Sequence, residues 1–176
     1  TFLRSEIPVH VVGMTNIVQI ATGPDHSFAI DFDKNLWAWG KNESGQLGNG
    51  DSTNCNLPVQ VVGMTNSVLA VASGYAHSLA IKTNGTVWEW GSPFGEIEAI
   101  LTPTHVPGLT NAISVAAGEA HSLVLLGDGT VWSWGSNGVG QLGDGTGNDT
   151  NAPVRVSGLS NIVAICSGSA HNMALE

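Results

Sequence analysis

The chain has 176 residues, of which 42% are hydrophobic and only 11% are charged, and its formal net charge is −9. This hydrophobic share excludes a disordered chain, and an excess of 14 acidic over 5 basic residues disfavours nucleic acid and anionic membrane surfaces as partners. No apolar run approaches the roughly 18 residues of a transmembrane helix, so we expect no membrane partner.

The chain consists of copies of a sequence repeat of about 50 residues. Each copy starts with a proline and a β-rich run, passes through a GMTN-like step, and continues into small and apolar residues such as IVQIATG. The steps lie 50, 45 and 50 residues apart, at Gly13, Gly63, Gly108 and Gly158. The resulting units are 8–57, 58–102, 103–152 and an incomplete unit 153–176.

The second half of each unit predicts a β-hairpin, most clearly in 118–145. There, a strand His121–Leu126 leads to Asp128-Gly129 and a second strand Thr130–Trp134. An Asp-Gly pair between two apolar runs favours a tight turn, because glycine adopts positive φ without steric cost.

The same hairpin occurs in the other units. Residues 74–91 carry Asn84-Gly85 at the turn, and residues 23–48 place Asn35 where the glycine would be. A fourth copy, GSAHNMALE, begins at Gly168 and ends inside its first strand.

Four strands per unit without any helical period predict an all-β fold, a β-propeller of four-stranded antiparallel blades with about 3.5 repeats present. The small-residue strand would line the central axis, and the proline-led strand would form the rim, where a missing N–H costs little. A β-sandwich is the alternative, but it has no reason to repeat its sequence four times. Cys55, in a predicted loop, and Cys166, in a predicted inner strand, are expected to be free thiols.

Two aromatic signals recur with the repeat. Tryptophans at i and i+2 point to one face of a strand, so a buried face between blades is favoured over a ligand-stacking or light-absorbing array. One histidine per unit could bind metal or act as a base. Successive blades separate these rings too far for one ion, so we expect each ring to bond backbone near the glycine-rich loop. The residues are Trp37, Trp39, Trp88, Trp90, Trp132 and Trp134, with His26, His77, His121 and His171.

The loops 45–54 and 140–151 contain clustered Asp and Asn. Asp144, Thr146 and Asn148 have the alternate spacing of a calcium loop, but no glutamate closes it. Turn chemistry, in which Asn, Asp and Gly bond the backbone, explains the same residues. We therefore expect no catalytic residue, no metal site and no cofactor.

The segments GEAHSLVL (118–125), GTVWSWG (129–135) and GVGQLGDG (138–145) together resemble the regulator of chromosome condensation repeat family. The similarity runs from Pro8 to the last residue. The family implies a propeller of about seven blades whose loops bind other proteins. These plain repeats are most similar to bacterial members, which include a secreted inhibitor of β-lactamases, although the sequence leaves localisation open.

Three departures from the family narrow the function that the resemblance implies. The regular spacing leaves no room for the wedge hairpin of nucleotide exchange factors, and the basic loops of chromatin-binding members are missing from the sequence. Ultraviolet-sensing members have Trp and Arg before the repeated His, where this chain has Pro24-Asp25, Tyr75-Ala76, Glu119-Ala120 and Ser169-Ala170. We expect a non-enzymatic scaffold that binds a protein partner through loops on one face. The alternatives are a ligand- or metal-sensing propeller and a guanine-nucleotide exchange factor-like regulator.

The second unit breaks the pattern. It has SPFGEIEAILT at 92–102 where other units have the GQLG loop, and it is about five residues shorter. A unit that departs from its repeat is where a special contact is expected, although repeat decay explains it too. The expected partner-binding residues are Phe94, Glu96, Ile97 and Glu98.

Closure of the ring is the remaining question. The sequence predicts a rim strand at 8–12, three full sets of strands and a fragment. These are fewer than the roughly 4–8 blades of a closed propeller. An open arc would expose apolar blade faces at both ends. The chain, which does not begin with Met, is thus expected to be part of a longer propeller or to self-associate, for example as a head-to-tail dimer.

Overall fold

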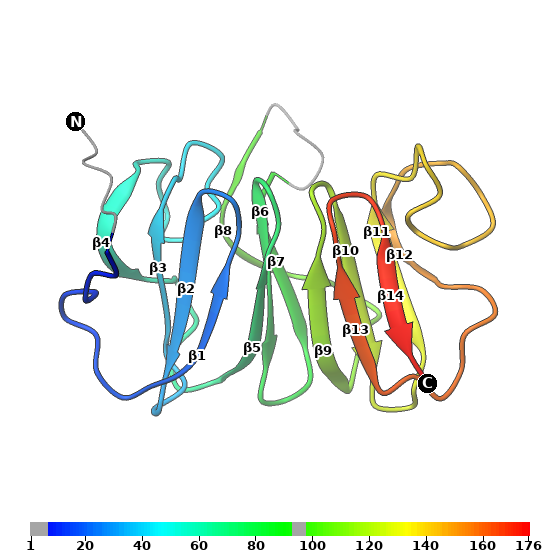
Figure 1. Cartoon of the computed structure of the whole chain (residues 1–176), viewed down its shortest axis with the longest axis horizontal. Helices are drawn as coiled ribbons and strands as arrows, with labels where there is room; N and C mark the ends of the chain where they lie inside the picture. The colour runs from blue at the N-terminus through cyan, green and yellow to red at the C-terminus, as the bar shows by residue number, and fades with distance from the viewer. Residues whose placement is uncertain (1–6, 93–97) are drawn as a thin grey trace.

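The computed structural model describes residues 7–92 and 98–176, and all regular secondary structure in these residues is β-strand. Three four-stranded antiparallel sheets follow one another, and a two-stranded sheet comes last (Figure 1). This confirms the predicted propeller architecture, with three complete blades and part of a fourth.

Each blade is one continuous stretch of chain. Blade 1 comprises β1 (Ile17–Thr22), β2 (His26–Asp31), β3 (Leu36–Gly40) and β4 (Cys55–Gln60). Blade 2 comprises β5 (Val68–Ser73), β6 (His77–Lys82), β7 (Val87–Gly91) and β8 (Ile100–His105). Blade 3 comprises β9 (Ala112–Ala117), β10 (His121–Leu126), β11 (Val131–Gly135) and β12 (Thr150–Arg155). Blade 4 has β13 (Ala164–Ser167) and β14 (Asn172–Leu175).

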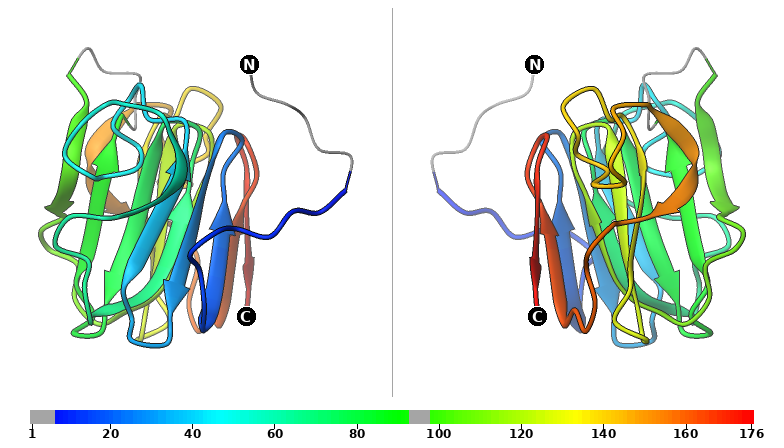
Figure 2. Two further views of the ribbon diagram at one scale, coloured as in Figure 1. Left: turned by 90° about the vertical axis from the view of Figure 1, so that its left-hand side faces the viewer. Right: turned by 90° about the vertical axis from the view of Figure 1, so that its right-hand side faces the viewer.

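The first strands of the blades, β1, β5, β9 and β13, contact one another in sequence. The fourth strands lie at the opposite edges of their sheets, and Figure 2 shows β8 on the side of the molecule away from β1 and β13. The small-residue strands therefore converge, because short side chains let neighbouring blades approach closely there. The proline-containing strands form the rim.

The rim differs from the prediction in two details. Each rim strand begins three residues before its proline, as β4 does before Pro58, so Cys55 is the first residue of a strand and not part of a loop. Residues 8–12 form no strand in the structure. Every rim strand pairs with the Trp strand that precedes it, and residues 8–12 have no Trp strand beside them.

The first hairpin turn also differs from the prediction. Lys34, and not Asn35, takes the place of the turn glycine, with φ 63° compared with 78° at both Gly85 and Gly129. The carbonyl at this position accepts a backbone N–H from the next blade in all three cases. These bonds, each 3.1 Å long, run to Lys34 from Val68, to Gly85 from Ala112 and to Gly129 from Ile162. The turn thus also joins neighbouring blades.

The hydrophobic cores lie between blades. Trp90 of blade 2 is fully buried in the first core, and Trp134 of blade 3 is buried in the second. Their counterpart in blade 1, Trp39, is only half-buried, because no described blade packs on that side. The first tryptophan of each pair is partly buried at the rim and donates its indole N–H to a side-chain oxygen. These donors are Trp37 to Asp31, Trp88 to Thr86 and Trp132 to Thr130.

The repeated histidines connect consecutive blades. The Nε2 atom of His26 lies 3.1 Å from the hydroxyl of Ser78 and 2.6 Å from that of Ser73, both in blade 2. In the same way, His77 reaches Ser122 of blade 3 at 3.1 Å. His121 reaches Asn172 of blade 4 at 2.8 Å. The partner is thus a side chain of the following blade, and not the backbone that the sequence led us to expect.

Burial keeps these rings uncharged. It lowers the pKa of His26 from 6.5 to about 4 and that of His77 to about 3. A glycine three residues earlier makes room for each ring, since a Cβ on Gly74 would collide with His77. The Gly-x-x-His spacing of the repeat is therefore a packing requirement.

A second polar contact completes each interface. The indole N–H of Trp90 and the hydroxyl of Ser78 both donate to the carbonyl of Gln46, in the GQLG loop of blade 1, at 2.9 Å. Blade 2 has no GQLG sequence. There, Glu89 accepts the equivalent donors, Trp134 at 3.0 Å and Ser122 at 2.9 Å. A side-chain carboxylate thus replaces a loop carbonyl.

Acid should weaken the blade interfaces. An unfolded histidine binds a proton near pH 6.5, whereas His26 and His77 stay neutral in the fold down to about pH 4 and pH 3. The free energy of unfolding should therefore be constant above pH 7. It should fall by about 2 kcal/mol or more per buried ring by pH 4.5. Urea titrations at several pH values measure this free energy. The substitution His77→Gln should make it depend less on pH, whereas His10→Gln, the control at an exposed position, should not. A flat profile between pH 7 and pH 5 would contradict this account.

Removing the carboxylate of Glu89 should destabilise the chain. Glu89→Ala leaves the buried Trp134 N–H and Ser122 hydroxyl without this acceptor, at a cost of about 2–4 kcal/mol. Glu89→Gln retains one oxygen and should cost less. Glu98→Ala, at an exposed position, is the matched control and should stay within about 0.5 kcal/mol. Equal urea midpoints for Glu89→Ala and the control would rule out this role of Glu89.

Candidate interaction surface

All long loops of the chain leave the same edge of the blades. The connections from the third to the fourth strands, 41–54 and 136–149, lie at the top of Figure 1, with the short turns that follow β1, β5, β9 and β13. We call this the upper face. The hairpin turns and the connections between blades form the lower face. Because every blade has the same strand order, each type of loop is confined to one face.

A buried asparagine organises the first long loop. The side-chain carbonyl of Asn42 accepts the N–H of Leu47 at 2.9 Å. Its amide donates to Asn49 and to the backbone carbonyl of Asp51, both at 2.9 Å. The backbone N–H of Asn42 donates to Asn54 at 2.6 Å. One side chain therefore fixes both ends of the GQLG loop.

Asn137 has the same function in the third blade. It accepts the N–H of Leu142 at 2.9 Å and donates to Asp144 at 3.2 Å. The backbone N–H and hydroxyl of Thr146 bind the Asp144 carboxylate and hold the pKa of that group below its usual value. Internal donors thus occupy the carboxylate that the sequence suggested as a calcium ligand, and Asn148 donates its N–H to Thr146 at 3.3 Å.

A shallow pocket of about 460 Å³ opens on the upper face where the short turns meet. Pro24, Tyr75, Glu119 and Ser169, one from each blade, line it together with the adjacent glycines. Glu119 accepts the Ser169 hydroxyl at 2.6 Å and donates its backbone N–H to the Ser169 carbonyl at 2.9 Å. The turns of neighbouring blades therefore support one another.

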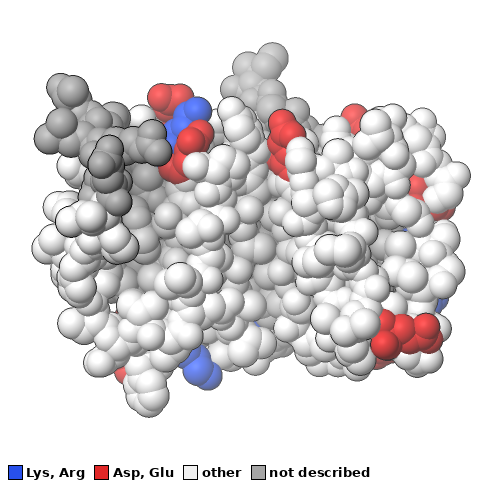
Figure 3. All heavy atoms as spheres, in the orientation of Figure 1, with Lys and Arg blue, Asp and Glu red and all other residues white. Residues whose placement is uncertain are grey.

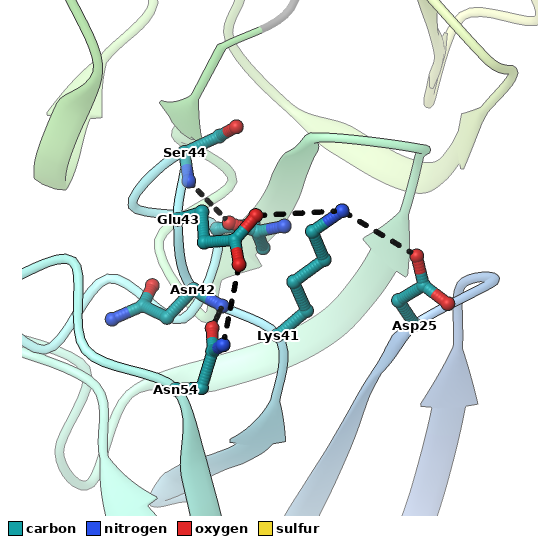
Figure 4. A network of polar contacts seen from close by, with 7 residues as sticks. Asp25, Lys41, Asn42, Glu43, Ser44 and Asn54 are labelled. Carbon is teal, nitrogen blue, oxygen red and sulfur yellow. Dashed lines mark hydrogen bonds and ion pairs between the residues drawn. The ribbon is translucent and has the colours of Figure 1, made fainter.

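Lys41 lies beside this pocket among acidic groups (Figure 4). Its ammonium is 3.9 Å from Asp25 and 3.7 Å from Glu43, and it lies 6.0 Å from the ring centre of Tyr75. These groups are partly exposed, so the ion pairs contribute little to stability. Their main effect is to offset part of the negative charge at this edge.

Charge is distributed unequally between the two faces. Among residues 7–92 and 98–176, the upper connections hold seven acids and one base, namely Asp25, Glu43, Asp51, Glu98, Glu119, Asp144 and Asp149 against Lys41. The lower connections and adjoining strand ends hold four acids and three bases, namely Asp31, Asp33, Asp128 and Glu176 against Lys34, Lys82 and Arg155. Figure 3 shows acidic side chains at several places along the upper edge, and others at the lower right. The upper face is therefore the more negative one.

Of the four residues expected to bind a partner, the structure describes only Glu98. Glu98 is exposed in the upper connection between β7 and β8. Phe94, Glu96 and Ile97 lie outside the described residues.

In the part that the structure describes, no three His, Cys, Asp or Glu side chains gather as a metal site would need, and no helix is long and apolar enough to cross a membrane. Cys55 and Cys166 are free thiols.

Sequence reasoning missed two residues that hold the loops of this surface, Asn42 and Asn137, and one that joins two blades, Glu89. Asn42 and Asn137 each stand two positions after a Trp-x-Trp-Gly segment, a recurrence visible in the sequence, whereas the second unit has Pro93 there. Glu89 stands between two tryptophans where the other units have Ala38 and Ser133. A charged residue at a small-residue position was the available signal.

Comparison with known proteins agrees with this architecture. Residues 33–81 and 128–175 match the Regulator of chromosome condensation (RCC1) repeat, and residues 17–46 and 112–141 match a second form of it. The Protein RCC2 homolog of Danio rerio is 34% identical over 110 residues, which are 55% of this chain and 22% of that protein.

Two solved structures of yeast Prp20 are similar to this one. Prp20p from Saccharomyces cerevisiae, studied with its binding to Gsp1p and histones, has a TM-score of 0.82 at 25% identity over 92% of this chain and 44% of that chain. Yeast RCC1 (Prp20) bound to Kap60 has a TM-score of 0.76 at 29% identity, over 90% of this chain and 41% of that chain. This chain thus spans less than half of each.

These relatives are zebrafish and yeast proteins, so they lend no support to the expected likeness to bacterial members. The matched residues make up more than half of the chain, and they include the tryptophan strands β3 and β11 and the histidine strands β2 and β10. The repeat matches and the blade architecture together show that the chain belongs to the regulator of chromosome condensation (RCC1) repeat family.

Proposed function

We propose that this chain is a non-enzymatic interaction module whose upper face binds a basic protein. The observation that carries the proposal is the charge asymmetry, with seven acids and one lysine in the described upper connections. Opposite charge on a partner speeds association and fixes its orientation. The lower face, where acids and bases nearly balance, offers no such preference.

The similar proteins support a protein partner. Prp20p is described as binding Gsp1p and histones, and yeast RCC1 (Prp20) is bound to Kap60. Histones are basic, so their charge complements the upper face of this chain. That nucleic acid is not a partner stays a prediction from the net charge of −9.

Neutralising exposed acids of the upper face should weaken histone binding. Glu98→Gln with Glu119→Gln removes two charges, and the glutamine at 119 can still accept the Ser169 hydroxyl. Exposed charges contribute about 0.2–1 kcal/mol each, so we expect the loss of two charges to weaken affinity by about twofold to thirtyfold at low salt. Titration calorimetry with purified core histones measures it. The difference should shrink as salt is added.

Asp33→Asn, in an exposed hairpin turn of the lower face, is the matched control and should leave the affinity unchanged. Equal losses from both faces would mean that binding follows net charge alone. An absence of histone binding to the wild-type chain would refute this partner assignment.

The 92–102 loop is proposed as the apolar part of the same surface. Partner-binding energy is commonly concentrated in a few side chains near the centre of an interface, and these are often aromatic. The double change Phe94→Ala with Ile97→Ala should therefore weaken binding by more than about 1 kcal/mol. The melting temperature should stay nearly the same. If this change instead unfolds the blade, the two side chains belong to the core and the assignment is wrong.

A further inference from the structure

The shallow pocket on the upper face is built from one position of the repeat. The residue that follows the glycine of each Gly-x-x-His segment lines it, and the four copies carry different side chains. These residues are Pro24, Tyr75, Glu119 and Ser169. The glycine and the histidine recur because they hold neighbouring blades together. The pocket therefore combines a repeated frame with side chains that differ from blade to blade.

Glycines bring the turns of neighbouring blades close together at this pocket. A Cβ on Gly74 would come within 2.8 Å of the Gly118 carbonyl oxygen. The backbone N–H of Tyr75 donates to the Glu119 carbonyl at 3.3 Å, and that of Glu119 donates to the Ser169 carbonyl at 2.9 Å. Blades 2 and 3, which supply Tyr75 and Glu119, each contact another described blade on both sides. Main-chain contacts inside the stack thus fix where these two side chains begin.

Tyr75 and Glu119 together suit one kind of ligand group. Tyr75 is 47% exposed, so much of its ring is open to a ligand. Glu119 is also exposed, and among the described residues only its Oε2 atom has a hydrogen-bond partner, the Ser169 hydroxyl. A guanidinium group is planar and always charged, stacks on aromatic rings and forms paired hydrogen bonds with carboxylates. An aromatic ring beside a carboxylate therefore fits an arginine side chain better than a lysine.

The surroundings of the Tyr75 ring favour a positive charge. The ammonium of Lys41 already lies 6.0 Å from the ring centre, at the outer limit of a cation–π contact. Asp25 and Glu43 lie 3.9 Å and 3.7 Å from this ammonium and offset its charge (Figure 4). The excess of acids in the described upper connections adds to the same field. The field and the ring therefore attract a cation together.

We propose that this pocket anchors the bound partner by taking one of its arginine side chains. The guanidinium binds the Glu119 carboxylate and lies against the Tyr75 ring, and the glycines that line the pocket leave room for the arginine stem. The inference rests on the proposed function, since it names the residue type that a basic partner presents at this point. Binding energy is thus concentrated at one place and is not spread evenly over the charges of the face.

A substitution that changes no charge separates this anchor from general attraction. Tyr75→Leu should weaken histone binding by about twofold to fivefold, because the stacking contact is lost while the net charge stays the same. Phe32→Leu removes an exposed aromatic ring from a hairpin turn of the lower face, so it is the matched control and should leave the affinity unchanged. Titration calorimetry with core histones measures both variants. Both should melt at the wild-type temperature, because both side chains are exposed.

Two substitutions that each remove one negative charge form a second matched pair. Glu119→Gln should weaken histone binding by about fivefold or more, although the glutamine can still accept the Ser169 hydroxyl. Glu98→Gln, at another exposed position of the upper face, should weaken it by about twofold or less. A face that acted only through its summed charge would lose the same affinity in both variants.

A small probe tests the pocket without histones. The peptide acetyl-Gly-Arg-Gly-amide should shift the backbone amide NMR signals of Tyr75, Glu119 and Ser169 in a saturable way. Citrulline has the shape of arginine without its charge, so the peptide that carries it should bind at least tenfold more weakly. The arginine peptide should also bind Tyr75→Leu more weakly than it binds the wild-type chain.

Three results would overturn the proposal. They are unchanged histone binding by Tyr75→Leu, equal losses in Glu119→Gln and Glu98→Gln, and an absence of saturable shifts with the arginine peptide. The first two would remove the anchor and leave the acidic upper face as the binding surface. Saturable shifts in a chain that does not bind histones would support the pocket and refute the histone partner, so the two proposals can fail separately.

Discussion

Each junction between blades depends on an imidazole that stays uncharged. His26, His77 and His121 reach across to a hydroxyl or an amide oxygen of the following blade, and a glycine three residues earlier gives each ring its place. A charged ring would need solvation that the interface cannot supply. The polar bond therefore fixes how neighbouring blades align, while the apolar cores beside it provide most of the stabilisation.

The same regularity separates two kinds of surface. Turns that must fit against a neighbouring blade, such as the one at Lys34, are constrained by backbone hydrogen bonds on the lower face. The long loops of the upper face are instead held from within by Asn42 and Asn137. Their outer residues are free to vary in charge without loss of blade packing.

The sequence predicted the fold well because every physical requirement of a blade is repeated. The turn glycines, the paired tryptophans and the small-residue strands recur at a spacing that only stacked blades explain. What could not be predicted is local. The position of Lys34 at positive φ depends on the register of one hairpin, since a lysine gives no turn signal of its own. The carboxylate of Glu89 acts between blades, so its partners Ser122 and Trp134 become visible only in three dimensions.

The candidate surface was predictable only in outline. The net acidity was evident from composition, but its concentration on one face follows from which loops leave the same end of the strands. The pocket lined by Pro24, Tyr75 and Glu119 was not foreseen either, because it forms where short turns of different blades meet.

The order of blades also bears on how the chain would unfold. In the described residues, blade 2 contacts blade 1 on one side and blade 3 on the other. A stack held together by contacts between nearest neighbours gains stability from each added interface and loosens first where an interface is missing. The amide protons of β6, which pairs with a strand on each side in a blade with two neighbours, would thus exchange with solvent only when the stack as a whole comes apart.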